Sequence, residues 1–353
     1  MSAVVEICDL APGYSISRVI RGGWQLAGGH GPIDRDRALD DLIAAFDAGV
    51  FTFDCADIYT GVEELYGAMR ARLVATRGAA SASRLRVHTK LVPDLSILRT
   101  IERRDIEAII DRSLRRLKME RLDLVQFHWW DYAEPRWLEA LSWLDDLRAK
   151  GKVRLIGGTN FDTAHVRAIV EAGIPLASMQ VQYSVLDRRL ENGLSALCRA
   201  HGVGLICYGS VAGGFLSDRW LGQPEPAQPL ANRSLVKYKL IIDDFGGWTL
   251  FQELLCALRR VADRRHCDIA TVASRFALDL PGVAAIIVGA TSRAHLAANA
   301  AAGALKLTDR DRSEIEAVAA KRQGPEGDVY QLERDRTGRH GSIMKYELNA
   351  EPA

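Results

Sequence analysis

The feature that most constrains this chain is an eightfold alternation of short β-rich runs with amphipathic helical stretches, from about residue 20 to residue 304. Alternating βα units of this kind feed a parallel sheet. Eight units favour closure into a (β/α)8 TIM barrel over an open doubly wound sheet, although periodicity alone leaves both possible. The predicted strands are Val19–Gly22, Phe51–Asp54, Leu85–Lys90, Leu122–Phe127, Val153–Gly158, Ala177–Gln180, Gly204–Tyr208 and Val283–Val288.

The stretches between these strands have the spacing of helices that face a core. In Asp111–Lys118, for example, Leu114 and Leu117 share one face with Ile110 while the arginines point elsewhere. Several stretches close with Gly or Lys-Gly, which is typical of a helix C-terminus. The predicted helices include Asp36–Ala48, Val62–Ala75, Arg104–Lys118, Pro135–Lys150, Thr163–Ala172 and Glu191–His201.

Two regions interrupt the alternation. Between Leu216 and Phe251, the segments GQPEPAQP and DDFGGW are rich in Pro and Gly, so we predict a long loop at the active-site end of the barrel. After Thr308 we predict a helix to Ala320 and then a polar tail with a few apolar residues. We expect this tail to be a surface extension, and the alternative is a flap at the pocket or a subunit contact.

Length and composition favour one soluble domain. A single domain over residues 1–353 is expected, with a barrel core at about 19–304 and a C-terminal extension at about 305–353. Lys plus Arg total 46 against 45 for Asp plus Glu, so the chain has no net electrostatic field that would attract nucleic acid or an anionic membrane surface. This charge balance suits a small neutral substrate. Neither a secretory signal nor a long apolar run is evident, so a cytoplasmic location is expected. The six scattered cysteines predict free thiols and no metal site, and oligomeric state is not readable.

Polar residues follow the carboxyl ends of consecutive predicted strands, where a barrel brings them to one pocket. A phenol is a weak acid at neutral pH, and a neighbouring ammonium lowers its pKa, a role that Lys90 can fill beside Tyr59. Asp54 can hold Lys90 charged, and His128 can donate a hydrogen bond to a substrate oxygen or pass a proton. The residues at the strand ends are Asp54, Tyr59, Lys90, His128, Thr159, Asn160, Gln180 and Tyr208.

The segments FDCADIY with GVEELYGAMR, VHTKL, DLVQFHWWD, IGGTNF, MQVQYS and LICYGSVAGGFL resemble, in this order, the aldo-keto reductase superfamily. The resemblance runs from about Gly22 to Asn299. It implies a catalytic tetrad of Asp54, Tyr59, Lys90 and His128, in which the tyrosine protonates a carbonyl oxygen while a nicotinamide cofactor delivers hydride.

The resemblance also implies a cofactor site. Thr159, Asn160 and Gln180 would bind the nicotinamide carboxamide, and Tyr208 would stack on its ring. A glycine-containing loop from Gly209 to Leu216, with Ser210, Ala212 and Gly214, would wrap the pyrophosphate. Gly22, Trp24 and Gln25 are further expected contacts. The family usually has Ser where this chain has Gly209, and Ser210 beside it is a possible substitute.

The segment IIVGATSRAHLAANAAA resembles the family's adenosine-phosphate site, where a helix N-terminus attracts anions. Arg293 can hold a 2′-phosphate, so NADPH is expected ahead of NADH. His295 and Ala298 depart from the family's usual residues and leave this preference open. The expected lining is Gly289, Ala290, Thr291, Arg293, His295 and Asn299.

Trp24, Trp129 and Trp130 are predicted to be pocket walls, and Trp24 and Trp129 are expected to contact substrate together with Tyr59 and His128. The predicted reaction is reduction of an aldehyde or ketone, or the reverse oxidation of an alcohol. Two alternatives stay open: a Schiff-base lyase that uses Lys90 on the same barrel, and a cofactor-binding regulatory subunit with little turnover. The sequence does not identify the substrate.

Overall fold

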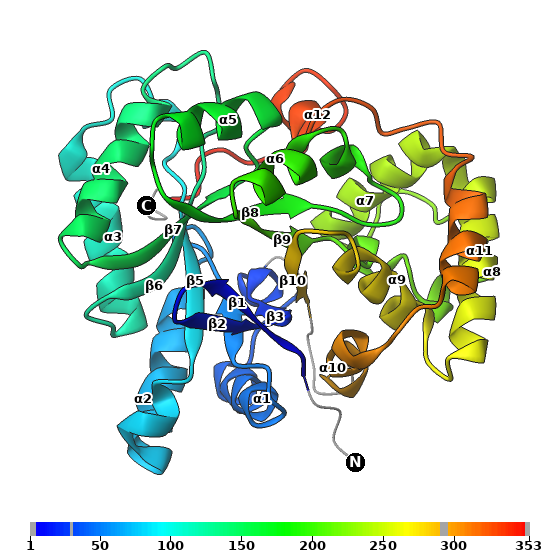
Figure 1. Cartoon of the computed structure of the whole chain (residues 1–353), viewed down its shortest axis with the longest axis horizontal. Coiled ribbons are helices and arrows are strands. Elements are labelled where there is room, and N and C mark those ends of the chain that lie inside the picture. Colours follow the sequence, from blue (N-terminus) through cyan, green and yellow to red (C-terminus); the bar gives the residue numbers. More distant parts are fainter. Residues whose placement is uncertain (1–4, 29–30, 290–295, 350–353) are drawn as a thin grey trace.

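The computed structural model describes residues 5–28, 31–289 and 296–349, with the backbone alone for 296–299. Its centre is a closed barrel of eight parallel strands in the order β10, β3, β4, β5, β6, β7, β8, β9, which confirms the predicted (β/α)8 fold (Figure 1). The barrel strands are β3 Val19–Gly22, β4 Thr52–Asp54, β5 Arg86–Leu91, β6 Leu122–Phe127, β7 Val153–Thr159, β8 Leu176–Gln182, β9 Gly204–Tyr208 and β10 Val283–Val288.

The register of the parallel strands brings the predicted site residues to one end of the barrel. Gly22 is paired with Asp54 across β3 and β4, and Thr159 is paired with Gln180 across β7 and β8. The end of β8 at Gln182 is paired with Tyr208 at the end of β9. Polar side chains at strand ends that are distant in sequence therefore face a common opening.

Helices surround the barrel, as Figure 1 shows. Helix α3 illustrates why they form: Ile106, Ile109 and Ile110 are buried on one face, and Glu102 and Asp105 make a capping box at the first turn. Lys118 then ends the helix in the left-handed region. The helices are α1 Arg35–Asp47, α2 Val62–Ala82, α3 Arg103–Leu117, α4 Trp137–Ala149, α5 Thr163–Glu171, α6 Leu194–Ala200, α7 Arg233–Phe245, α8 Gly247–Arg264, α9 Ile269–Leu278, α10 Leu296–Ala304, α11 Asp309–Ala319 and α12 Gln331–Arg334.

The predicted loop between Leu216 and Phe251 is wrong over its second half, where α7 and the start of α8 lie. The Asn232 side chain caps α7 by accepting a hydrogen bond from the Leu235 N–H. Tyr238, Ile241, Ile242 and Phe245 then bury one face of this helix at helical spacing. The Gly-Gly pair 246–247, which suggested a loop, is a junction between two helices.

An N-terminal hairpin, β1 (Ile7–Ala11) with β2 (Tyr14–Ser17), was not predicted. Leu10, Tyr14 and Ile16 pack against residues in the first halves of the barrel strands, such as Leu124 and Ile206, so the hairpin covers the end of the barrel opposite the predicted site. This end of a (β/α)8 barrel ordinarily serves stability.

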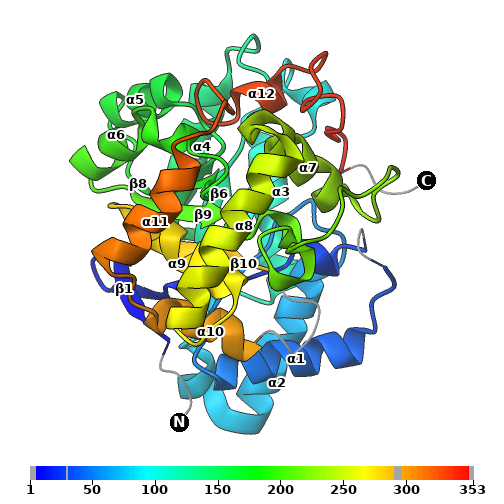
Figure 2. The ribbon, with the colours of Figure 1, turned by 90° about the vertical axis from the view of Figure 1, so that its right-hand side faces the viewer.

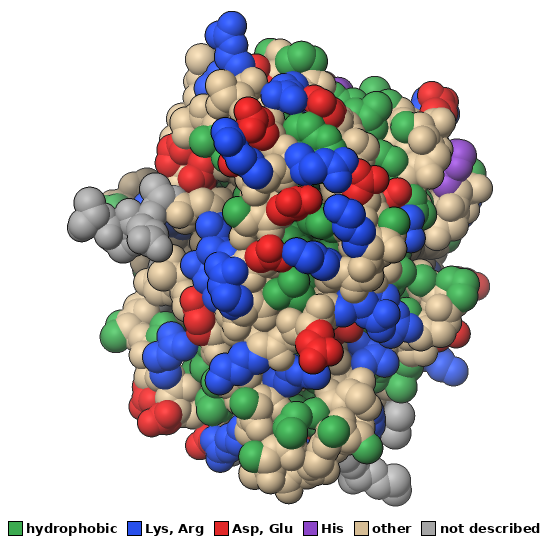
Figure 3. Space-filling model, turned by 90° about the vertical axis from the view of Figure 1, so that its left-hand side faces the viewer, with side chains coloured by type: hydrophobic (Ala, Val, Ile, Leu, Met, Phe, Trp, Pro, Cys, Tyr) green, Lys and Arg blue, Asp and Glu red, His purple; other side chains and the backbone are tan. Residues whose placement is uncertain are grey.

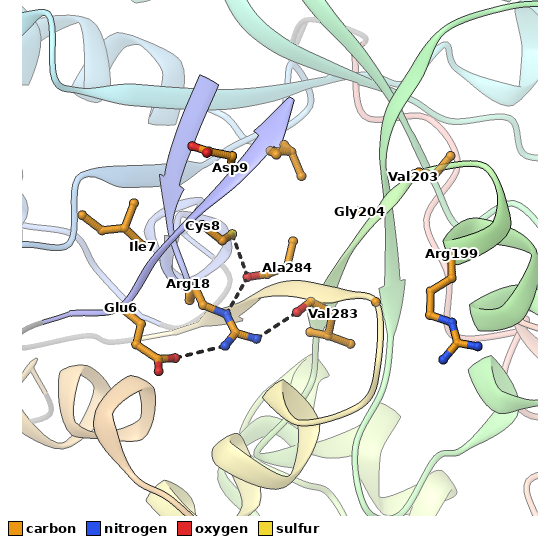
Figure 4. A pocket seen from close by; sticks show the side chains of 13 residues that line it. Glu6, Ile7, Cys8, Asp9, Arg18, Arg199, Val203, Gly204, Val283 and Ala284 are labelled. Carbon is orange, nitrogen blue, oxygen red and sulfur yellow. Dashed lines mark hydrogen bonds and ion pairs between the residues drawn. The ribbon is translucent and has the colours of Figure 1, made fainter. Parts of the chain in front are cut away.

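A hollow of about 530 Å³ lies beside β1 and the start of β10 (Figure 4). The Arg18 guanidinium crosses it, and Figure 4 shows its bonds to Glu6 and to the backbone carbonyls of Val283 and Ala284. A fourth bond from Arg18 reaches the carbonyl of Leu278. All of these bonds join parts of the fold, so we assign this hollow a structural role.

The C-terminal part begins with α11, where helix 308–320 was predicted. Figure 2 shows α11 beside α8, and the ion pair between Arg264 and Asp311 joins these two helices. Residues 321–349, which we call the strap, then cross the mouth of the barrel and contain α12. Leu95 N–H donates to the carbonyl of Tyr346 in the strap at 3.1 Å, which fastens its end beside β5.

The described surface has mixed charge. On the face in Figure 3, basic and acidic side chains are interspersed, in keeping with a neutral chain. Within residues 5–28, 31–289 and 296–349, the structure contains no helix whose length and apolar content would let it traverse a lipid bilayer. All six cysteines are free thiols.

Candidate active site

A cavity of about 770 Å³ lies at the carboxyl end of the barrel strands, beneath the strap. Most of the predicted site residues for which a side chain or Cα is described line it. They are Gly22, Trp24, Gln25, Asp54, Tyr59, Lys90, His128, Thr159, Asn160, Gln180, Tyr208, Gly209, Gly214 and Gly289.

The Asp54 carboxylate and the Lys90 ammonium form a buried ion pair at the base of this cavity. The Lys90 Nζ lies 2.8 Å from Asp54 Oδ2 and also donates to the carbonyl of Cys55 at 2.8 Å. Asp54 Oδ1 accepts from the amides of Gln126 and Gln180 at 3.1 and 2.7 Å. Burial alone would lower the pKa of Lys90, but the Asp54 carboxylate raises it above its ordinary value. Lys90 is therefore an ammonium at neutral pH.

The Tyr59 phenol lies beside this ion pair, with Lys90 Nζ 5.1 Å from the centre of its ring. Lys90 lowers the pKa of Tyr59, as the sequence predicted, but the net shift of this pKa is upward. Burial raises the pKa of Tyr59 by more than Lys90 lowers it, and Asp54 raises it further. Tyr59 is consequently a protonated phenol at neutral pH, with a cation close enough to stabilise a phenolate.

His128, at the end of β6, has a fixed orientation. Its Nδ1 lies 3.0 Å from the carbonyl oxygen of Thr159, which can only accept, so Nδ1 carries the proton. Burial is the main cause that lowers the pKa of His128 to about 3, with further lowering by Arg334. Nε2 therefore bears a lone pair, and it is buried with no partner among the described residues. A neutral His128 accepts a hydrogen bond at Nε2 and does not donate one there. The predicted role of His128 as a hydrogen-bond donor to the substrate oxygen is therefore wrong.

Asn160, Gln180 and Tyr208 form a second polar group in the cavity wall. The Tyr208 hydroxyl donates to Asn160 Oδ1 at 2.8 Å, which leaves the Asn160 amide N–H groups for another acceptor. Asn160 lies in the left-handed region at φ 61°, and its backbone N–H donates to the carbonyl of Gln180 at 2.9 Å. Gln180 donates to Asp54, so its carbonyl oxygen can accept. The wall thus offers one amide donor and one amide acceptor to a planar ligand.

The loop from Gly209 to Leu216 contributes backbone and glycines to the cavity. A side chain at Gly209 would meet the Tyr238 hydroxyl at 2.4 Å, which explains a glycine at this position. Gly214 has φ 101° and open space where a side chain would be.

Three predicted cofactor contacts in this loop do not line the cavity. Ala212 and Leu216 are buried in the apolar cluster that α7 and α8 form with this loop. The Ser210 hydroxyl is buried 3.5 Å from the Ser274 hydroxyl. The Ser210 side chain therefore does not take the place of the serine that the family usually has at position 209. The expectation that Ser210 substitutes for this serine is wrong.

Trp130 lines the cavity as predicted, whereas the prediction that Trp129 is a pocket wall is wrong. Trp129 is fully buried, and its indole N–H donates to the carbonyls of Asp131 and Glu134 at 2.9 and 3.0 Å. Trp130 lines the cavity with its ring perpendicular to that of His128, at 4.3 Å between ring centroids. Trp24 lines the cavity as predicted, 5.1 Å from the Tyr59 ring.

Part of the predicted adenosine-phosphate site falls outside the described residues. Ala290, Thr291, Arg293 and His295 are not described, and Asn299 belongs to α10 without a described side chain. Gly289, the first residue of this predicted site, lines the cavity.

Sequence reasoning missed a group of cavity residues on α7 and the strap. Tyr330 lies in the left-handed region at φ 61°, with its ring 5.6 Å from that of His128. The apolar spacing in α7 was the available signal for that helix, whereas no local pattern shows where the strap packs. The missed lining residues on these two segments are Arg233, Ser234, Val236, Lys237, Tyr238, Tyr330, Ile343, Met344, Lys345 and Leu348, and Arg219 was missed as well.

The strap is held over the site by buried charges. Arg189 lies between Asp187 and Glu333, with Arg189 Nη1 to Glu333 Oε2 at 2.9 Å and Arg189 Nη2 to Asp187 Oδ2 at 2.7 Å. The guanidinium of Arg334 donates to the carbonyls of Trp130 and Asn160 at 2.7 and 2.8 Å. The strap thus forms part of the cavity wall, which agrees with the alternative of a flap at the pocket rather than with a surface extension.

Comparison with known proteins agrees with this geometry. The model of the aldo/keto reductase family matches residues 18–320. The chain is 27% identical over 323 residues to an NADH-specific methylglyoxal reductase of Escherichia coli, covering 86% of this chain and 95% of that protein. It is 25% identical over 317 residues to the aldo-keto reductase YhdN of Bacillus subtilis, covering 87% and 91%.

Two solved structures show the same fold at lower identity. A glycerol dehydrogenase from Gluconobacter oxydans superposes with a TM-score of 0.74 at 22% identity, covering 92% of this chain and 98% of that one. An aldo/keto reductase from Klebsiella pneumoniae, solved with NADP and acetate, has a TM-score of 0.67 at 21% identity, covering 93% and 98%. With the family model matched over most of its length, this chain belongs to the aldo/keto reductase family of oxidoreductases.

Proposed function

We propose that this protein reduces an aldehyde or ketone with a nicotinamide cofactor, or runs the reverse oxidation, and that Tyr59 is the general acid and base. One observation carries the proposal: Asp54, Tyr59, Lys90 and His128 converge on one cavity, where the Nε2 of His128 is buried without a protein partner. An orphaned polar atom of this kind in a cavity wall indicates a ligand group.

The proton transfer can be assigned to Tyr59. Its raised pKa keeps the phenol protonated, so it can donate to a carbonyl oxygen that gains negative charge. The Lys90 ammonium stabilises the phenolate that remains, because a cation near the ring favours the charged form. Asp54 keeps Lys90 charged and in place.

His128 has a complementary role in this proposal. Its Nε2 lone pair can accept a hydrogen bond from the hydroxyl of an alcohol, and the Thr159 carbonyl holds the ring so that this lone pair faces the cavity. We assign to His128 the orientation of the alcohol, as product of reduction or as substrate of oxidation.

The cavity residues fit a nicotinamide cofactor. The amides of Asn160 and Gln180 provide one donor and one acceptor, which match a carboxamide, and the Tyr208 ring offers a flat face. Gly214 leaves the loop backbone open, and Arg219 lines the same cavity, as a pyrophosphate site requires. When bound, the cofactor supplies the hydride. We propose NADPH on the argument from Arg293, with NADH as the alternative, because one relative is named as NADH-specific.

The lyase alternative conflicts with the state of Lys90. A Schiff base requires a neutral amine, whereas the Asp54 carboxylate raises the pKa of Lys90 and takes one of its hydrogen bonds. We therefore propose that the protein is a carbonyl reductase of the cytoplasm that acts on a small substrate.

The test is cofactor consumption with a panel of aldehydes, using NADPH and NADH in separate assays. Tyr59→Phe should lower kcat by about 10²- to 10⁴-fold and leave the Kd for NADPH, measured by its fluorescence, within about threefold. Tyr66→Phe is a matched control, because this buried phenol donates to the Asp54 carbonyl and does not line the cavity. NADPH binding without turnover by the unmodified protein would instead support the regulatory role.

A further inference from the structure

We propose that Lys237 binds an anionic group of the substrate, a carboxylate or a phosphate, so that preferred substrates are carbonyl compounds with a negative charge. This inference rests on the proposed reductase function. It narrows the substrate class, which neither the fold nor the tetrad specifies.

Lys237 is a cavity residue whose ammonium is surrounded by aromatic rings. Its Nζ lies 5.1 Å from the ring centre of Tyr208, 5.8 Å from that of Tyr238 and 6.0 Å from that of Tyr330. These rings attract the cation through their faces but do not neutralise it. They therefore hold the charge in place and leave its N–H groups available to a ligand.

The neighbouring lysine on the same helix shows the contrast. Lys239 is paired with the carboxylates of Glu225 and Asp243. Lys237 has no ion pair and no hydrogen bond to any residue that the structure describes. Burial lowers the pKa of Lys237 by more than the nearby Glu333 and Asp187 carboxylates raise it, and an anion bound beside Lys237 would favour the charged form.

The charge balance of the cavity points the same way. Arg219, Arg233, Lys237 and Lys345 line it, and none of them has a carboxylate partner among the described residues. Asp54 is the one carboxylate in the described lining, and Lys90 already neutralises it. A partly enclosed cavity with this excess of cations concentrates anions.

Lys237 lies on α7, which packs against the loop proposed to hold the cofactor phosphates, since side chains at Gly209 and Gly213 would both meet Tyr238. The Nζ of Lys237 is also 6.0 Å from the centre of the Tyr330 ring, which belongs to the strap. The Tyr330 ring is in turn 5.6 Å from the His128 ring. These two distances place the Nζ of Lys237 within about 12 Å of the centre of the His128 ring. A substrate with its oxygens about 3 Å from each of these groups needs only a few carbons, or one benzene ring, between the carbonyl and the anion.

The experiment compares aldehydes that differ in charge, in the intact protein with its cofactor. The rigid pair is 4-carboxybenzaldehyde and its methyl ester, and the flexible pair is succinic semialdehyde and butanal. In the wild type, kcat/KM should be about 10- to 100-fold higher for the charged member of at least one pair. Lys237→Met should remove this preference, with the neutral aldehyde changed by less than about threefold.

Two further variants and a binding measurement control the test. Lys237→Arg should keep most of the preference, and Lys239→Met should keep all of it, because Lys239 does not line the cavity. The Kd for NADPH should stay within about threefold in Lys237→Met. A wild type that reduces ester and acid equally would overturn the inference alone. A weaker Kd for NADPH with an unchanged preference would assign Lys237 to a cofactor phosphate and also overturn it. Reduction of no aldehyde with either cofactor would overturn the proposed function itself.

Discussion

The ion pair between Glu333 and Arg189 should hold the strap over the active site. Arg189 donates to both carboxylate oxygens of Glu333, at 2.9 and 3.0 Å, and both residues are buried. Tyr330 lies three residues before Glu333 and faces His128. The perturbation of interest is therefore Glu333→Gln, which removes one charge and keeps nearly the same shape.

The size of the effect follows from the pKa of Glu333. Burial alone would raise this pKa, but Arg189 lowers it from an ordinary value of 4.5 to about 2. At 1.36 kcal/mol per pH unit, this difference corresponds to about 3 kcal/mol of stability at neutral pH. Since the pKa is depressed in the folded state, this stability is present above about pH 4.5 and is lost as the pH falls toward 2. Removal of one partner from a buried pair has a cost of similar size.

Hydrogen exchange is the appropriate assay, because the strap can open while the barrel stays folded. At neutral pH, Glu333→Gln should accelerate exchange of peptides from residues 328–348 by up to about 100-fold and leave the peptides of β5 to β7 unchanged. Glu326→Gln is the matched control, since Glu326 is exposed in the same segment and has no ion pair in the described part of the chain. Equal exchange of the strap in wild type and Glu333→Gln would refute this reasoning.

Two further predictions concern the barrel itself. Burial, followed by repulsion from Glu63, raises the pKa of Asp57 to about 8. The folded protein therefore keeps a proton that the unfolded chain releases above about pH 4, and stability falls as the pH rises from about 4 to 8. Asp57→Asn should remove this loss. The difference in free energy of unfolding between the variant and wild type, measured by urea unfolding, should therefore rise by on the order of 1 kcal/mol per pH unit between pH 5 and 8. The same pH dependence of this free energy in both proteins would contradict the prediction. Trp130→Ala should change the ratio of kcat/KM between small and bulky aldehydes by about tenfold, because Trp130 lines the cavity. Trp129→Ala should instead lower the free energy of unfolding by about 3 to 5 kcal/mol, because Trp129 is fully buried. Similar substrate ratios in the two variants would argue against Trp130 as the cavity wall.

The barrel and the polar residues at its mouth could be predicted because both depend on local patterns. Each strand is a short apolar run, and a parallel barrel places every carboxyl-terminal strand end at the same opening. Asp54, Lys90 and Gln180 are therefore brought together by topology alone, which sequence spacing can reveal. The direction of the pKa of Tyr59 could not be predicted in this way, because it depends on how deeply the phenol is buried.

Features that depend on packing between distant segments were missed. Both Trp129 and Trp130 were predicted to face the pocket, whereas the side-chain directions after β6 place Trp129 in the core and Trp130 at the cavity. Helix α7 was obscured by proline and glycine on either side of it. The place of the strap depends on Arg189 and Arg334, which bind carboxylates and carbonyls far away in the sequence.

Arg334, on the strap, contacts residues on both sides of the cavity. Its guanidinium donates to the Trp130 carbonyl, beside His128, and to the Asn160 carbonyl, on the side proposed for the nicotinamide. Asn160 is held in the left-handed region by backbone contacts of this kind. Since the same cation fixes a residue on each side, movement of the strap would displace the substrate wall and the cofactor wall together. Substrate access and cofactor binding should therefore be coupled through the strap, with Arg334 in contact with both walls.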